Sequence, residues 1–230
     1  MIKHLVLIPD GNRRWAKRKG LLSWQGHLEG AKVVEKILEK VLELKIPYFT
    51  FWGGSYDNLT KRSKTEIKFL LKIYENYFKR LLEEKRIDEN KVKINVFGRW
   101  EGIFPESLKK IIERTIEKTK NYNQHFFSFL LAYNGTDEML DCVRKILREK
   151  KVKVNENLIK ENLWTKNLPP VDLLIRTGCE GDPHNSAGFM MWHTAYSQFY
   201  FSKTLFPDFT PKEFEKAIKD FLKRERRLGK

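Results

Sequence analysis

The chain has 230 residues, of which 41% are hydrophobic and 33% charged, and its net charge is +15. This composition supports a hydrophobic core in one large domain or two small ones, and the positive charge favours nucleic acid, phosphorylated small molecules or an acidic membrane face as partner. Two cysteines, Cys142 and Cys179, exclude a disulfide framework or zinc site, and without a membrane-spanning or signal segment we expect a cytoplasmic protein.

Short apolar runs alternate with amphipathic stretches along the whole chain. The apolar runs predict strands at residues 5–8, 48–52, 92–96, 126–132, 171–175 and 198–201. Helical spacing of apolar residues predicts helices at residues 33–44, 65–82, 108–119, 136–147 and 212–227. This alternation, with no linker or internal repeat, predicts a single α/β domain over residues 1–230. We expect a mostly parallel sheet of about six strands flanked by helices.

The predicted helix at residues 65–82 has an unusually wide apolar face. Phe69 and Ile73 broaden it beyond the stripe that packing on one neighbour requires. The helix either packs against two neighbours or lines an apolar cavity with one flank.

A polar stretch, PDGNRRWAKRKG, follows the first predicted strand. In open α/β sheets ligands bind beyond the carboxyl ends of strands, and the N-terminus of the next helix can bind phosphate. Arg13 and Arg14 add donors suited to phosphate, whereas Asp10 would repel an anion unless a cation lay between them. Mg²⁺ held by one carboxylate and substrate phosphates fits this pattern. Alternatively, Asp10 only caps a helix whose basic first turn is solvated.

Two further strand ends carry polar groups. The strand at 171–175 runs into RTGCEG, which places Arg176 at its carboxyl end, and the strand at 48–52 runs into GGSYDNLTKRS. Taken alone, Arg176 could be a surface ion-pair partner, and the second segment an ordinary turn with a helix cap. Three such ends in one sheet favour a shared anion site.

Five segments, in this order and spacing, resemble motifs of the cis-prenyltransferases, the family that includes undecaprenyl diphosphate synthase. PDGNRRWAKRKG resembles the Asp-Gly-Asn opening motif, and GHLEGAKVVEKIL resembles the segment after it. RTGCE resembles the Arg-x-Gly-x-Glu motif, MMWHTAYSQFYFSKTLFPDF the Trp-rich closing motif and RERRLG the C-terminal tail. The match covers nearly the whole chain, and the combination is highly specific.

The resemblance implies a reaction in which an allylic diphosphate ionises and isopentenyl diphosphate adds to it repeatedly in the cis configuration. It also implies a polyprenyl diphosphate as product, Mg²⁺ as cofactor, and farnesyl or geranylgeranyl diphosphate as allylic substrate. The resemblance also implies a homodimer whose subunits each enclose a hydrophobic tunnel. A lipid product and a charge of +15 suit peripheral contact with an anionic membrane.

The resemblance also assigns roles to residues. Asp10 would hold Mg²⁺ and help the diphosphate leave, and Asn58 would be the second catalytic residue. The residues implied to bind substrates are Gly11, Asn12, Arg13, Arg14, Trp15, His27, Asp57, Arg62, Arg176, Glu180, His184, Ser186, Arg227 and Gly229. The group from Gly11 to His27 would bind the allylic substrate. Arg176, the loop at 180–186 and the tail would bind isopentenyl diphosphate.

Two departures from the family pattern lie in the first half of the chain. The middle motif reads GSYDNLTKRS, so Asp57, Asn58 and Arg62 align with the usual Glu-Asn and arginine only after one inserted residue. Ser23 stands where an arginine is usual. These changes leave the expected fold intact and bear on substrate choice.

Two more departures lie in the second half. The loop after Arg176 is longer than usual and lacks a second arginine, and His184 is its expected substitute by position. Gln198 replaces a glutamate of the metal site, so we assign Gln198 to the metal with Asp10 and expect weaker Mg²⁺ binding. The alternative for Gln198 is a polar cap at a strand start, remote from the metal.

Two other functions remain open at the level of sequence. A non-catalytic accessory subunit of a cis-prenyltransferase complex would share the fold, although such subunits typically lose the Asp-Gly-Asn arginine cluster that this chain keeps. A nucleic-acid-binding protein would explain the charge. The lysines of this chain, however, are spread over all predicted helices, without a basic stripe or interleaved aromatic residues. We therefore expect no nucleic acid partner.

Overall fold

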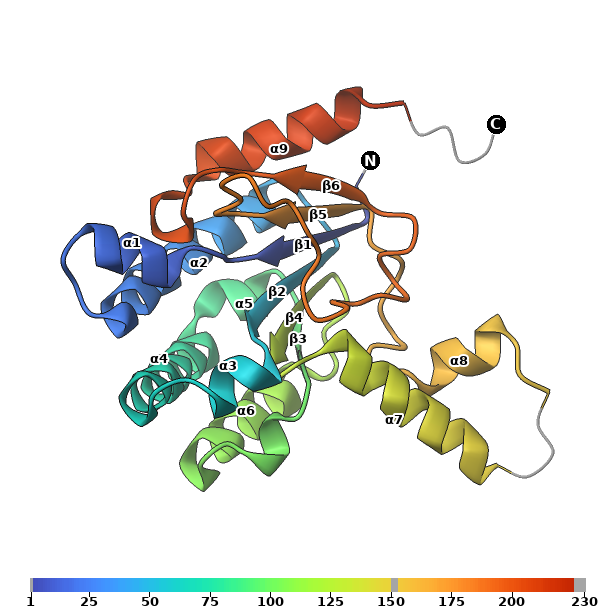
Figure 1. Ribbon diagram of the computed structural model, residues 1–230. Coiled ribbons are helices and arrows are strands. Elements are labelled where there is room, and N and C mark those ends of the chain that lie inside the picture. Colours follow the sequence, from blue (N-terminus) through green and yellow to red (C-terminus); the bar gives the residue numbers. More distant parts are fainter. Residues whose placement is uncertain (1, 150–152, 226–230) are drawn as a thin grey trace.

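The framework of the molecule is one six-stranded sheet (Figure 1), in a computed structural model that describes residues 2–149 and 153–225. The strands are β1 (His4–Ile8), β2 (Tyr48–Gly54), β3 (Val92–Phe97), β4 (His125–Leu131), β5 (Leu173–Arg176) and β6 (Gln198–Phe201). Their order is β3-β4-β2-β1-β5-β6, and each neighbouring pair is parallel. The predicted α/β fold and all six predicted strands are confirmed.

Helices connect the strands. They are α1 (Asn12–Arg18), α2 (Ser23–Glu43), α3 (Tyr56–Thr60), α4 (Lys64–Glu83), α5 (Lys85–Glu89), α6 (Glu106–Thr119), α7 (Gly135–Arg148), α8 (Glu156–Asn162) and α9 (Pro211–Lys223), with short 3₁₀ turns at Trp100–Gly102 and Phe206–Asp208. The five predicted helices are present.

Two helix boundaries differ from the prediction. Helix α2 begins ten residues earlier, at Ser23, because its first half packs on α1 through glycine rather than through apolar side chains. A Cβ atom at Gly26 would lie 2.0 Å from the carbonyl oxygen of Asn12. Helix α9 ends at Lys223 instead of continuing to 227, since Arg224 is extended and its Nη1 donates to the carbonyl of Phe199 at 3.0 Å.

The two faces of the sheet are covered differently. Leu5 and Leu7 of β1 face a large core formed with α2, α4, α6 and α9. Val6 and Ile8 face a second core, which the irregular segments at 164–171 and 189–190 cover. Alternate residues of β1 point to opposite faces, so both faces are apolar and the whole strand is buried, as expected of a central parallel strand.

Helices α7 and α8 form an outlying pair that extends away from the sheet (Figure 1). A small core joins them, built from the buried Cys142, Ile146 and Leu163. Cys142 and Cys179 are both buried and unpaired with each other, in agreement with the absence of a disulfide framework.

Candidate active site

The carboxyl ends of β1 and β5 meet at one edge of the sheet. Ile8 pairs with Arg176 in the β1–β5 register, so Asp10, two residues beyond Ile8, lies next to the Arg176 side chain. Gly11 precedes α1 with a φ of 110°, a backbone conformation that residues with a side chain rarely adopt. It allows the chain to turn directly after Asp10. The expected convergence of strand ends is therefore observed.

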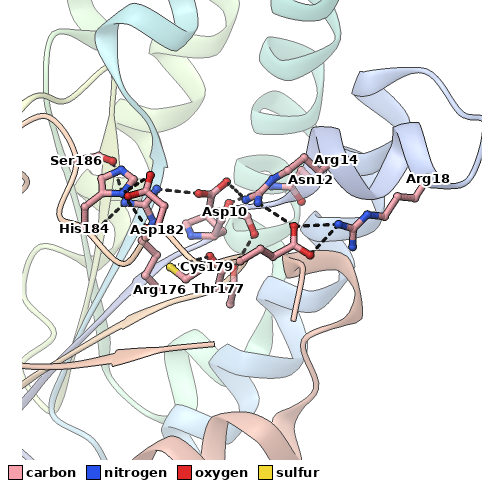
Figure 2. Close-up of polar contacts among 12 residues, drawn as sticks. Asp10, Asn12, Arg14, Arg18, Arg176, Thr177, Cys179, Asp182, His184 and Ser186 are labelled. Carbon is pink, nitrogen blue, oxygen red and sulfur yellow. Dashed lines mark hydrogen bonds and ion pairs between the residues drawn. The ribbon is translucent and has the colours of Figure 1, made fainter. Parts of the chain in front are cut away.

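Asp10 lies between two arginines from these strand ends (Figure 2). Its Oδ1 accepts from Nη2 of Arg14 at 3.0 Å, and its Oδ2 accepts from Nη2 of Arg176 at 2.8 Å. Arg176, 7% exposed, also donates to Oγ of Ser186 at 2.9 Å. Glu180 binds Arg14 at 3.1 Å and Arg18 at 2.7 Å. We call these five charged residues the Asp10 cluster.

A second carboxylate, that of Glu66, contacts two arginines and a histidine on the other side of the same site. Oε1 of Glu66 lies 3.1 Å from Nη1 of Arg62, 3.3 Å from Nε2 of His27 and 3.5 Å from Nε of Arg13. These groups come from α1, α2, the segment after α3, and α4. We call these four residues the Glu66 cluster.

The Glu66 cluster shifts the proton affinities of its members. The hydrogen bond with His27, helped by the charges of Arg62 and Arg13, lowers the pKa of Glu66. Burial lowers the pKa of His27, although the bond with Glu66 acts in the opposite direction. Burial also lowers the pKa of Arg62. The carboxylate therefore stays ionised between two guanidinium groups, and burial favours the neutral form of the His27 ring.

A cavity of about 390 Å³ lies between the two clusters. Ten of the residues predicted for the site line it: Asp10, Gly11, Asn12, Arg13, Arg14, His27, Asn58, Arg62, Arg176 and Ser186. Four arginines at one cavity suit an anion with several oxygens, because guanidinium groups bind phosphates through paired donors. The sequence prediction of a shared anion site agrees with this geometry.

A small apolar cavity of about 70 Å³ adjoins the charged one. The two share six lining residues: Pro9, Asn12, His27, Gly53, Leu70 and Tyr74. The apolar cavity continues between α2, α4 and the sheet as far as Tyr77, which also lines a third cavity of about 70 Å³ beyond it. One flank of α4 thus lines an apolar cavity, which is the second of the two interpretations of its wide apolar face.

Four of the described residues predicted to bind substrates lie outside the charged cavity. Trp15 donates from Nε1 to Asp208 at 2.8 Å, and Asp57 pairs with Lys61 at 3.1 Å. Glu180 contacts the site through its bonds to arginine. The backbone carbonyl of His184 accepts from Nη1 of Arg176 at 2.6 Å, and Nδ1 of its ring lies 2.9 Å from the carbonyl oxygen of Asp182.

Gln198 does not meet Asp10 within the chain. It begins β6 opposite Leu173 at the start of β5, whereas Arg176 at the end of β5 binds Asp10. Its Oε1 accepts from Nη1 of Arg224 at 3.3 Å. The predicted metal site of Asp10 and Gln198 is therefore not formed by one chain, and Gln198 is a polar residue at a strand start. The predicted tail residues Arg227 and Gly229 lie outside the described residues.

Sequence reasoning missed two charged residues of the site. Arg18 follows Arg14 by one helical turn, a spacing that places both on one face of α1 and could have indicated it. Glu66 follows Ser63 by three residues, which indicates a helix cap rather than a site residue.

The chemistry of the site is compatible with Mg²⁺ at Asp10. Among residues 2–149 and 153–225, no three His, Cys, Asp or Glu side chains form a metal-binding group. Mg²⁺ does not require such a group, because one or two carboxylates and substrate phosphates suffice. Asp10 offers one carboxylate, 34% exposed, on the wall of the cavity where several arginines would bind those phosphates.

No helix in the described part of the chain combines the length and apolar character needed to cross a bilayer.

Comparison with known proteins assigns the family. Residues 8–229 match the Prenyltransf family, described as undecaprenyl diphosphate synthase. The chain is 38% identical to a tritrans,polycis-undecaprenyl-diphosphate synthase (geranylgeranyl-diphosphate specific) of Pyrococcus abyssi, covering 99% of this chain and 87% of that protein. It is also 38% identical to an isoprenyl transferase of Rickettsia prowazekii, covering 100% of this chain and 98% of that protein.

A solved structure agrees with these relatives. Lavandulyl diphosphate synthase from Lavandula x intermedia, in complex with dimethylallyl diphosphate, superposes with a TM-score of 0.92 at 27% identity, covering 100% of this chain and 98% of that one. The activities named for these proteins favour the enzyme over the accessory subunit and the nucleic-acid-binding protein. The chain belongs to the undecaprenyl diphosphate synthase family and is a cis-prenyltransferase.

Proposed function

We propose that the chain condenses isopentenyl diphosphate with farnesyl or geranylgeranyl diphosphate to make a polyprenyl diphosphate. The observation that carries this proposal is a cavity lined by four arginines that adjoins an apolar cavity. An allylic diphosphate has the same two parts, a charged head and an apolar chain. The Pyrococcus abyssi relative is named as specific for geranylgeranyl diphosphate, which favours the longer primer.

The residues of the site suit the chemistry of this reaction. The allylic carbon–oxygen bond breaks, and its electron pair leaves with the diphosphate. The isopentenyl double bond then forms the new carbon–carbon bond, and a proton is lost from the isopentenyl unit. Arg13, Arg14 and Arg62 would stabilise the departing negative charge, and Arg176 would bind the second diphosphate. Mg²⁺ bound by Asp10 would supply further neutralisation of the diphosphate.

The growing chain would extend along α4. The apolar cavity beside the diphosphate pocket continues to Tyr77, and this residue also lines a further cavity. These spaces support a hydrophobic tunnel between α2, α4 and the sheet. They are small without a bound chain, so the tunnel would have to widen as the product grows.

Helix α7 supports the expected homodimer. Leu140, Val143 and Leu147 lie on one face of this helix and are 53%, 47% and 78% exposed. Their spacing gives an apolar stripe, which a second copy of the chain would cover. Light scattering of the purified protein should give the mass of a dimer, and Leu147→Glu should shift it toward the monomer.

A second apolar surface supports peripheral contact with an anionic membrane from the cytoplasm. Trp24 stacks on Phe69 at 4.1 Å, beside Leu22, which is 64% exposed. Exposed lysines adjoin these residues in sequence, at Lys17, Lys19, Lys64 and Lys68. Vesicles with anionic lipid should bind the protein more strongly than neutral ones. Leu22→Glu should weaken binding, unlike Leu222→Glu on α9, where the leucine is 55% exposed.

The reaction itself can be tested with the purified chain alone. Given Mg²⁺, isopentenyl diphosphate and geranylgeranyl or farnesyl diphosphate, it should release inorganic diphosphate and form longer prenyl diphosphates, identified by mass. Product from the chain alone would also exclude an accessory role. No product with either primer would contradict the proposal.

A further inference from the structure

Glu66 touches two arginines and a histidine that line the charged cavity, yet it does not line the cavity itself. It is 6% exposed and lies in the first turn of α4. A glutamate is almost never this buried unless it is paired, because an unpaired buried charge is costly. The pairing with Arg13, His27 and Arg62 is therefore what allows Glu66 to occupy this position.

The side chain of Glu66 is directed away from its usual local partner. Ser63 caps α4, and its Oγ accepts from the backbone N–H of Glu66 at 3.3 Å. In a capping box the glutamate would in turn accept from the backbone N–H of Ser63. Oε1 of Glu66 instead lies against Arg62 and His27 at 3.1 and 3.3 Å. The carboxylate thus contacts residues that line the cavity and not the backbone of its own helix cap.

We propose that Glu66 is a positioning residue for the allylic diphosphate, and that it acts by holding Arg13, His27 and Arg62 in place; this inference rests on the proposed function. The three side chains come from separate segments of the chain, and one oxygen atom joins them. Long side chains lose conformational freedom on binding a ligand. Groups that are already held in place bind and stabilise the diphosphate at a lower entropic cost.

Glu66 also keeps His27 from competing for Arg62. Nε2 of His27 lies 3.3 Å from Oε1 of Glu66 and 3.1 Å from Nη1 of Arg62. This nitrogen can donate to the carboxylate or accept from the guanidinium, but one nitrogen cannot do both at once. Nη1 of Arg62 now donates to Glu66 at 3.1 Å; without the carboxylate, Nε2 becomes its acceptor, and the guanidinium is held by the ring on α2 instead of the carboxylate on α4.

Steady-state kinetics of Glu66→Ala and Glu66→Gln test this role. In Glu66→Ala we expect kcat/KM for the allylic diphosphate to fall about 100-fold, as misplacement of reacting groups can cost. Glutamine keeps an acceptor oxygen at the same reach, so Glu66→Gln should recover part of the loss. The KM for isopentenyl diphosphate should stay near its normal value in both variants, because Arg176 lies in the other cluster.

Glu75→Gln is the matched control. Glu75 lies on the same helix and also pairs with two cations, Lys79 at 2.7 Å and Lys72 at 3.6 Å, but it lines neither the charged nor the adjoining apolar cavity. Its variant should keep wild-type kinetics. A purely structural role for Glu66 would lower the melting temperature and leave kcat/KM per folded molecule unchanged.

The outcomes separate this inference from the proposed function. If the wild-type chain makes no prenyl product, the proposed function fails. Suppose instead that the wild type is active and that both Glu66 variants keep kcat/KM for the allylic diphosphate within about twofold of the wild-type value. The loss is then smaller than misplaced groups would cause, and the positioning role is wrong. Should Glu66→Ala not fold, Glu66→Gln alone decides: equal kinetics for Glu66→Gln and Glu75→Gln would overturn the inference.

Discussion

Asp10 and Glu66 each collect arginines at the same cavity, but their surroundings differ. The Asp10 side chain is 34% exposed and lines the cavity, whereas that of Glu66 is 7% exposed and lies behind its wall. An exposed ion pair contributes about 0–1 kcal/mol, whereas removing one partner of a buried pair costs about 3–5 kcal/mol. The exposed pair of Asp10 with Arg14 can therefore open when a diphosphate arrives, whereas the pairs of Glu66 with Arg62 and His27 persist.

The comparison separates two tasks that carboxylates perform at an anion site. Asp10 is bonded to Arg14 and Arg176, and under the proposed function an arriving diphosphate would displace it and leave it free to hold Mg²⁺. Glu66 keeps its arginines in place and has no need to move. Four predictions would break or sharpen this distinction.

The largest effect should come from Asp10→Ala. We expect kcat to fall at least about 100-fold, because a group that stabilises the leaving charge is lost. Raising the Mg²⁺ concentration should not restore the rate. The melting temperature should change by no more than about 4 °C, as for a loss of up to about 1 kcal/mol in a chain of this size. Rates are measured by release of inorganic diphosphate.

Asp10→Ala should also bind inorganic diphosphate more tightly when Mg²⁺ is absent, since Arg14 and Arg176 no longer have a competing carboxylate. Calorimetric titration of the metal-free protein measures this affinity. A near-normal turnover, or a weaker metal-free affinity, would show that Asp10 does not act as an exchangeable partner.

Tyr77→Ala should change the product and leave both clusters unaffected. Tyr77 lines both small apolar cavities, so its removal should join them. We expect longer products by mass spectrometry, with kcat/KM for the first condensation near normal. Phe69→Ala is the control, because Phe69 is exposed and stacks on Trp24 outside these cavities. An unchanged length distribution for Tyr77→Ala would place the growing chain elsewhere.

A smaller effect concerns the titration of His27. Burial lowers the pKa of His27 below 6.5, and the bond with Glu66 partly opposes this shift. Glu66→Gln removes the charge of that partner, so the pKa of His27 should fall further. The ring therefore stays neutral to a lower pH in the variant. Nuclear magnetic resonance of the imidazole follows the midpoint, and a midpoint that rises in Glu66→Gln would contradict the cluster described here.

The smallest effect should come from Asp57→Ala. This third carboxylate is exposed, pairs with Lys61 at 3.1 Å and does not line the cavity. A surface ion pair contributes little to stability. We therefore expect kcat/KM to stay within about twofold of the wild-type value, and the melting temperature to stay within about 4 °C of it. A loss comparable to that of Asp10→Ala would mean that Asp57 moves to the substrate.

Local sequence patterns predict most of the fold and the site residues that follow the ends of strands. Strand–helix alternation predicts a parallel sheet, and such a sheet brings Asp10 and Arg176 together because both follow the ends of strands. Glycine spacing, in contrast, concealed the first half of α2, where Gly26 replaces the apolar contacts that the pattern relies on.

The remaining site residues depend on tertiary contacts. Glu66 resembles a helix cap in sequence, and its role appears only when α1, α2 and α4 come together. Gln198 and His184 were assigned by family pattern. The β5–β6 register places Gln198 away from Asp10, and the loop directs the backbone of His184, not its ring, to Arg176. Neither the register nor the loop path is visible in residue spacing.

The strand order has a consequence for how the molecule is made on the ribosome. The central strand β1 is synthesised first, but its neighbour β5 lies near the other end of the chain, and the ion pair of Asp10 with Arg176 spans 166 residues. Until β5 has emerged, one edge of β1 has no partner, and such edges promote aggregation. The active site is thus completed late in synthesis, and chains cut short before residue 173 cannot form it.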